Sequence, residues 1–143
     1  MTKRTIGKKF LLKRQARKIV FSALYAQSIT GGAVSLQSIT SAMQQPQAID
    51  IDYAQSILNA YHEDAVQVNQ YIDTYAQLEK RTGNTEVERA ILQMATAELI
   101  HSDLPHKVVI NEAIEITKEY GAGDGYKFIN AVLDKIAKAL TGA

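Results

Sequence analysis

The chain has 143 residues, enough for one domain with its own hydrophobic core, and its 46% apolar and 22% charged residues are typical of a globular protein. It holds no cysteine, which excludes disulfide bonds, thiol catalysis and cysteine-bound zinc and fits a reducing compartment such as the cytoplasm. No apolar run is long enough for a membrane-spanning helix, and the formal net charge is +1.

The basic residues gather at the start of the chain. Residues 1–49 carry eight lysines and arginines and no acid, so they contribute +8, while residues 50–143 contribute −7. This asymmetry predicts a polyanion at the basic end and a basic partner on the acidic body, unless the basic end is only a solvated tail. We expect residues 1–9 to form a flexible basic extension and residues 10–143 to form a single helical domain.

The first helix is predicted from Phe10 to Ile29, because the glycines in Thr30–Gly32 allow the left-handed conformation that ends helices. Three further helices are predicted before residue 84 from apolar residues at helical spacing. These apolar residues are Leu36, Ile39, Met43, Tyr53, Ile57, Tyr61, Val68, Ile72, Tyr75 and Leu78. The expected boundaries between these helices are Pro46, an N-cap at Asp50, a bend at His62–Asp64 and a break at Arg81–Asn84.

The last 60 or so residues predict three more helices. Thr85 and Glu88 have the spacing of a capping box, Ser102–His106 is a connection, Gly121 stops the next helix and Asp124 caps the last one. The inward positions are Val87, Ile91, Met94, Ala95, Val109, Ala113, Ile116, Tyr120, Phe128, Val132, Leu133 and Ile136. No alternating strand pattern competes with these helices. The predicted fold class is therefore all-α, with about seven helices.

The first helix has two unlike faces on a helical wheel of about 100° per residue. One face carries Arg14, Arg17, Lys18, Phe21 and Tyr25, and the opposite face carries Leu12, Ala16, Ile19, Val20 and Ala23. We interpret the aliphatic face as core and the other as an outer surface for single-stranded RNA, because guanidinium groups pair with phosphates and rings stack on bases. Four cations within six residues, Lys13, Arg14, Arg17 and Lys18, repel one another and predict an external anion. The alternative for Phe21 and Tyr25 is ordinary core packing.

Nothing in the sequence predicts a catalytic site. GAGDG at Gly121–Gly125 follows a helix rather than a strand and is better explained as a helix stop and N-cap than as a nucleotide loop. Glu112, Glu115 and Glu119 share one helix face, but a repeating exposed stripe does not set carboxyl pKa values apart as acid–base catalysis requires. We expect that stripe to be solvated or to meet a basic protein, and we expect no enzymatic activity, no metal and no cofactor.

Four segments together carry a family resemblance. KRQARKIVFSALYAQ, VERAILQMATAELI, VVINEAIEITKEYG and DGYKFINAVLDKI, in this order and spacing, resemble the NusB family of bacterial transcription antitermination factors. The resemblance runs from Lys13 to about Ile136. It implies an all-helical fold of two small packed bundles and binding of the boxA element of nascent ribosomal RNA transcripts together with the ribosomal protein NusE. The RNA polymerase antitermination complex with NusA and NusG is the wider partner that it implies.

The resemblance also implies roles for particular residues. The basic start of the family's first helix belongs to the RNA surface and corresponds here to Lys13, Arg14, Arg17 and the neighbouring Lys18, with Tyr25 at the family's tyrosine. The segment before the last helix, which belongs to the same RNA side, corresponds to Asp124, Lys127 and Phe128. Glu88 corresponds to a candidate partner-side position.

Two other functions stay open at this point. NusB-like domains also precede the catalytic domain of some ribosomal RNA cytosine methyltransferases, where they position RNA. Because the sequence ends at Ala143 without an α/β methyl-donor segment, we expect a stand-alone factor. A basic end that contacts lipid head groups is the other alternative, because Phe10, Leu11 and Leu12 interrupt the lysines.

Overall fold

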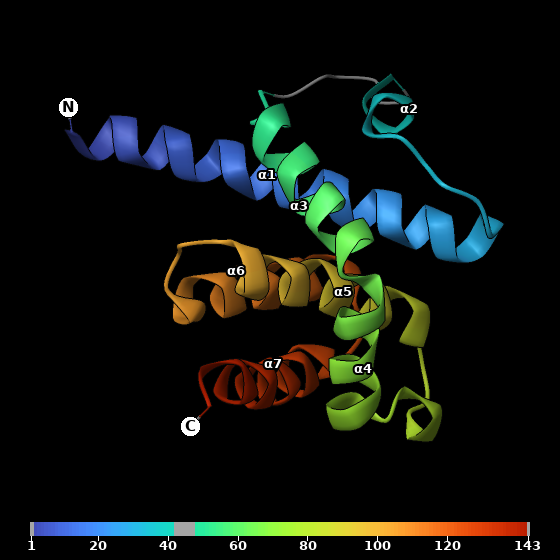
Figure 1. Cartoon of the computed structure of the whole chain (residues 1–143). Helices are drawn as coiled ribbons and strands as arrows, with labels where there is room; N and C mark the ends of the chain where they lie inside the picture. The colour runs from blue at the N-terminus through green and yellow to red at the C-terminus, as the bar shows by residue number, and fades with distance from the viewer. Residues whose placement is uncertain (1, 42–47, 143) are drawn as a thin grey trace.

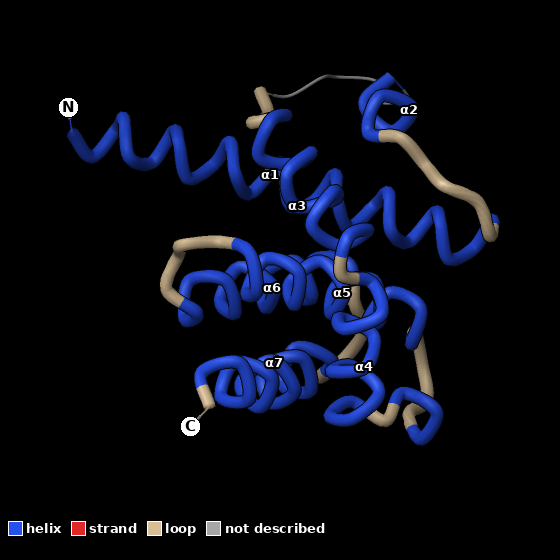
Figure 2. Tube along the Cα trace, viewed as in Figure 1, coloured by secondary structure: helices blue, strands red, loops and turns tan. Residues whose placement is uncertain are grey.

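A computed structural model describes residues 2–41 and 48–142 of the chain. In this part the chain forms seven α-helices, one short 3-10 helix (η1) and no strand. Figures 1 and 2 show how the helices are arranged. The elements are α1 (Thr2–Thr30), α2 (Leu36–Ser41), α3 (Ile51–Glu63), α4 (Ala65–Ala76), η1 (Leu78–Lys80), α5 (Thr85–His101), α6 (His106–Tyr120) and α7 (Gly125–Thr141). The predicted all-α class and helix number are confirmed.

Helix α1 is longer than predicted. It begins at Thr2 instead of near Phe10, so the segment expected to be irregular is helical in its backbone. The physical reason is that residues 2–9 contain no proline and hold four lysines and arginines, which are good helix formers. In α2, the predicted Met43 and the boundary at Pro46 lie outside the described residues.

Two helices begin next to a residue whose side chain accepts a backbone N–H of the first helical turn. The carboxylate of Asp50 accepts the backbone N–H of Tyr53 at 3.0 Å, as predicted for the N-cap of α3. The predicted capping box at α5 is wrong, because Asn84 is the N-cap: its side chain accepts the backbone N–H of Val87 at 3.4 Å. The carboxylate of Glu88 instead accepts hydrogen bonds from Arg81.

Helix α5 is the centre of the fold. Twelve of its 17 residues are buried, which identifies it as a helix covered on all sides. Helices α1 and α3 pack on α5 and on each other, and α4, α6 and α7 pack around α5 in a second group (Figure 1). The two groups share α5, so the expected pair of packed bundles is confirmed. The N-terminal turns of α1 extend past the body of the molecule.

Helix α6 runs beside α1 in the same direction, since Arg14 contacts Glu112 and Lys18 contacts Glu119. This pairing brings the basic stretch of the chain against the acidic stripe that lies about 100 residues further along the sequence. No described helix is both long and apolar enough to cross a bilayer.

Candidate nucleic-acid interface

Arg17 lies inside the protein and not on its surface. Its side chain is 2% exposed, and the residue points from α1 toward α5. Its Nε lies 2.8 and 3.0 Å from the two carboxylate oxygens of Glu98, its Nη2 lies 2.7 Å from Glu98 Oε2, and its Nη1 lies 3.5 Å from Glu112 Oε1. The prediction that Arg17 faces RNA is therefore wrong, because α5 and α6 supply the anions for its charge.

The pKa of Arg17 reflects the same geometry. Burial of the guanidinium lowers its pKa, but the hydrogen bonds and the charge of Glu98 outweigh burial, so that the pKa is raised above its usual value. Arg17 is therefore a permanent cation within a neutralised cluster. Each guanidinium nitrogen of Arg17 has a carboxylate partner, and the buried side chain connects helices instead of facing a ligand.

Arg14 is held in part by the same cluster. Its Nε and Nη2 lie 3.1 and 2.9 Å from the two oxygens of Glu112, whose side chain is only 3% exposed, while the Arg14 side chain is 31% exposed. The hydrogen bonds that Arg14 donates to Glu112 are the main reason that the pKa of Arg14 is raised. The expectation of an exposed acidic stripe is thus wrong for Glu112, and it holds for the exposed Glu115 and Glu119.

The lysines of α1 differ in exposure and in whether they pair with a carboxylate. Lys13 is half-buried with its Nζ 4.8 Å from the ring centre of Tyr53, and Lys18 Nζ lies 2.8 Å from Glu119. Lys8 and Lys9 are exposed, and neither has a carboxylate within ion-pair distance in the described part of the chain. The cations that remain open to a polyanion on this helix are therefore at its N-terminal end, ahead of the arginines.

The aromatic part of α1 is mostly interior. Phe21 is 5% exposed, so its ordinary core role holds and its predicted place on an outer face is wrong. Its ring lies 6.2 Å from the ring of Tyr25 and 5.2 Å from the ring of Tyr120, which is itself 42% exposed. Burial, and then the charge of Glu119, raises the pKa of the Tyr120 hydroxyl. Half-buried Tyr25 and exposed Tyr120 are thus the rings that reach the surface on both sides of Phe21.

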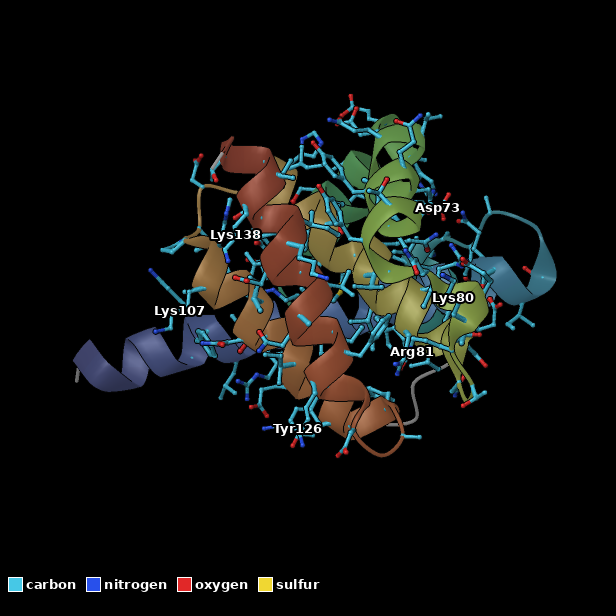
Figure 3. All side chains as sticks on the ribbon, turned by 90° about the horizontal axis from the view of Figure 1, so that it is seen from below. Asp73, Lys80, Arg81, Lys107, Tyr126 and Lys138 are labelled. Carbon is cyan, nitrogen blue, oxygen red and sulfur yellow. The ribbon has the colours of Figure 1, made fainter. Side chains whose placement is uncertain are left out.

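The turn between α6 and α7 adds a second group of cations and rings. Lys118 Nζ lies 5.1 Å and Lys127 Nζ 6.0 Å from the ring centre of Tyr126. Asp124 stands at the N-cap position of α7, but its side chain makes no cap hydrogen bond and instead lies 3.9 Å from Lys127. We call Lys118, Tyr126 and Lys127 the lysine–tyrosine face. Figure 3 shows Tyr126 at one end of α7, with Lys138 near the other end.

Glu88 and Phe128, which the sequence assigned to different surfaces, meet at Arg81. The guanidinium carbon of Arg81 lies 3.6 Å from the ring centre of Phe128, while its Nε and Nη2 lie 2.8 and 2.7 Å from the carboxylate oxygens of Glu88. The Glu88 side chain is 8% exposed. Its predicted partner-side role is therefore not supported by its position, because the carboxylate is buried and already paired.

Sequence reasoning missed four residues of these surfaces. Lys118 and Tyr126 were not singled out, Tyr120 was assigned only to the core and Arg81 only to a helix break. A signal was present in TKEYGAGDGYKF, where lysines and aromatic residues lie on both sides of a glycine-rich turn. A turn of this kind brings both sets of side chains to one end of a helix pair, which is typical of surfaces that stack bases and neutralise phosphates.

These features define a class: an all-helical protein of two bundles that share one central helix, with cationic and aromatic side chains exposed where α6 meets α7. Comparison with known proteins identifies the family. The model of the NusB family matches residues 14–138, and the chain belongs to this family.

Similar proteins cover nearly all of the chain. It is 35% identical over 147 residues to the transcription antitermination protein NusB of Haemophilus influenzae, with 98% of both chains covered. It is 38% identical to the NusB of Actinobacillus succinogenes, over 93% of this chain and 94% of that one. Among solved structures, NusB of T. maritima superposes with a TM-score of 0.71 at 31% identity, covering 87% of this chain and 89% of that chain.

Proposed function

We propose that this protein is a transcription antitermination factor that binds the boxA element of nascent ribosomal RNA transcripts in the cytoplasm. In this role it binds RNA jointly with the ribosomal protein NusE and joins NusA and NusG in the antitermination complex on RNA polymerase. The observation that carries the proposal is the match of the chain, over more than nine tenths of its length, to antitermination proteins of nearly the same length.

The surface supports a nucleic-acid partner, although not through the arginines that the sequence pointed to. Single-stranded RNA needs exposed cations for phosphates and exposed rings for bases. Lys8 and Lys9 supply cations on α1, and the lysine–tyrosine face supplies both kinds of group at the α6–α7 turn. Half-buried Tyr25 adds a ring one helical turn beyond Phe21, whose ring also packs on Tyr120 at the end of α6.

The acidic surface supports a basic protein partner. Glu115 and Glu119 on α6 are exposed, and the chain beyond residue 49 carries a net charge of −7. Complementary charge of this kind speeds and orients association with a basic protein such as a ribosomal one.

Titration of labelled RNA with the purified protein tests the proposal. We expect boxA RNA to bind more tightly than a scrambled RNA of equal length, with a larger difference when NusE is present. If about four phosphates are neutralised, the logarithm of the affinity falls against the logarithm of the salt concentration with a slope near −3. Equal affinity for both RNAs in the presence of NusE would contradict the proposal, as would an affinity that does not respond to salt.

A further inference from the structure

Arg81 holds an unusual position in the connection between α4 and α5. Its guanidinium plane lies against the ring of Phe128, with 3.6 Å between the guanidinium carbon and the ring centre. One edge of the plane is fixed by two hydrogen bonds of 2.8 and 2.7 Å to Glu88. These bonds are the main reason that the pKa of Arg81 is raised. A long side chain that is held from one face and one edge has little rotational freedom left to lose on binding.

Packing beneath this group keeps it in place. Glu88 is buried under the first turn of α7, where a Cβ atom added to Gly125 would lie 3.1 Å from Glu88 Oε2. The glycine therefore lets the first turn of α7, which carries Phe128, approach the carboxylate that orients Arg81. Glu88, Arg81 and Phe128 form one unit built from three elements of the fold.

The unit is open on its outer side. The Arg81 side chain is 30% exposed, and its Nη1 donates no hydrogen bond within the part of the chain that the structure describes. Figure 3 shows Lys80, Arg81 and Tyr126 on the face of the molecule that α7 crosses. Phe128 and Tyr126 both lie in the first turn of α7 but on different sides of it, so the unit and the lysine–tyrosine face flank the start of this helix.

We propose that the stacked pair of Arg81 and Phe128 is a platform for one base of single-stranded RNA. In this arrangement the strand continues from the lysine–tyrosine face, past the α6–α7 turn, to the connection between α4 and α5. The inference rests on the proposed function, since it names a further contact for the same RNA. Guanidinium planes and aromatic rings are both surfaces on which unstacked bases pack.

The charges decide which part of the nucleotide the platform contacts. Glu88 neutralises Arg81 through a bidentate pair. This pair occupies the Nε–Nη2 edge of the guanidinium, which could otherwise bind a phosphate in a bidentate manner. The platform therefore binds a base by stacking, and its contribution to affinity is nearly independent of salt. Lys127 and Lys118, whose nearest carboxylates lie 3.9 and 3.8 Å away, contact phosphates and contribute to the salt dependence.

Arg81→Lys tests the proposal because it retains the charge and removes the planar group. We expect the variant to bind boxA RNA about tenfold more weakly with an unchanged salt slope, since stacking of one base is worth about 1–3 kcal/mol. RNAs that carry 2-aminopurine at one position each provide a direct readout: wild-type protein quenches the probe at the stacked position, and Arg81→Lys loses that quenching alone. Arg89→Lys is the matched control, because Arg89 lies 3.9 Å from Asp73 and does not contact an aromatic ring in the described chain. It should behave as wild type.

Each remaining outcome has a definite meaning. Unchanged affinity and quenching in Arg81→Lys overturn the platform while the proposed function stands. A salt slope that becomes less steep by about 0.7 in Arg81→Gln, which removes the charge, assigns Arg81 to a phosphate and also overturns the platform. If circular dichroism shows that Arg81→Lys is unfolded, Phe128→Leu replaces it, because this variant leaves the pair of Arg81 and Glu88 in place. Retained quenching in Phe128→Leu overturns the platform, and loss of quenching supports it. A wild-type protein that binds no RNA overturns both proposals.

Discussion

Arg17 and Glu98 form a buried bidentate ion pair that joins α1 to α5. The side chains are 2% and 1% exposed, and the shortest distance between them, from Nη2 to Oε2, is 2.7 Å. The hydroxyl of Tyr53 on α3 donates a hydrogen bond to the same carboxylate. This one glutamate of α5 therefore connects α5 to both α1 and α3. Part of the basic stretch of α1 therefore pairs with carboxylates inside the protein and holds the helices together.

Arg17→Ala should therefore destabilise the fold by about 3–5 kcal/mol, because it leaves the carboxylate of Glu98 buried without its counter-charge. Urea unfolding followed by circular dichroism measures the effect. Lys9→Ala is the control: this lysine is exposed on the same helix, and its replacement should change stability by less than about 0.5 kcal/mol.

The double variant Arg17→Met, Glu98→Met separates the charge from the packing. Replacing both partners with apolar side chains removes the unpaired anion, so we expect this variant to be more stable than Arg17→Ala. An Arg17→Ala protein with wild-type stability and weakened RNA binding would show instead that the guanidinium is available to RNA.

Tyr53 should titrate at unusually high pH. Burial of its hydroxyl, followed by the charge of Glu98, raises the pKa of Tyr53 from 10.0 to about 12. In the unfolded chain the hydroxyl ionises near pH 10, whereas in the folded protein it stays protonated to about pH 12. This stabilising contribution is complete below pH 10 and is lost as the pH rises toward 12. Titration of tyrosine absorbance should show one group near pH 12 that is absent in Tyr53→Phe; an unchanged titration curve would contradict the geometry.

Lys8 and Lys9 should contribute to RNA affinity through charge alone. Changing both to glutamine removes about two phosphate contacts, so the salt slope should become less steep by about 1.4, without a change in unfolding free energy. Lys138→Gln is the matched control, because Lys138 lies near the end of α7 that is far from Tyr126 (Figure 3). Its Nζ lies 3.1 Å from Asp134. Filter binding at four salt concentrations measures the slope. Equal slopes for the wild type and the double variant would remove the N-terminal end of α1 from the RNA surface.

Gly121 is required by the close approach of the chain at the end of α6. A Cβ atom at this position would lie 2.7 Å from the backbone oxygen of Thr117 and 3.1 Å from its Cγ2. Gly121→Ala should therefore cost about 1–3 kcal/mol of unfolding free energy and disturb the turn that leads into α7, where Tyr126 lies. Gly32→Ala is the control, since a Cβ atom there would have no neighbour within 4 Å. Thermal unfolding of the two variants gives the comparison, and equal melting temperatures would contradict the expected clash.

Helix boundaries could be read from the sequence because they depend on neighbouring residues. Asp50 caps α3, the bend at Asp64 separates α3 from α4, and Gly121 follows the end of α6, as predicted. The N-cap of α5 was misplaced by one residue, because Asn84 and Thr85 are both good capping residues and spacing alone does not choose between them. The family was also within reach of the sequence, since it depends on the order and spacing of whole segments.

The direction in which α1 faces was decided only by the tertiary structure. Helical periodicity shows that Arg14, Arg17 and Phe21 share a face, but it does not show whether another helix covers that face. Here α5 and α6 cover it, and the carboxylates that neutralise Arg17 come from residues 81 and 95 positions further along the chain. A buried charge is tolerated when its counter-charge is fixed beside it, and long-range packing alone supplies that neighbour. The sequence by itself determined the helices and the family, whereas the tertiary structure decided which cations are paired inside the protein and which remain exposed for a partner.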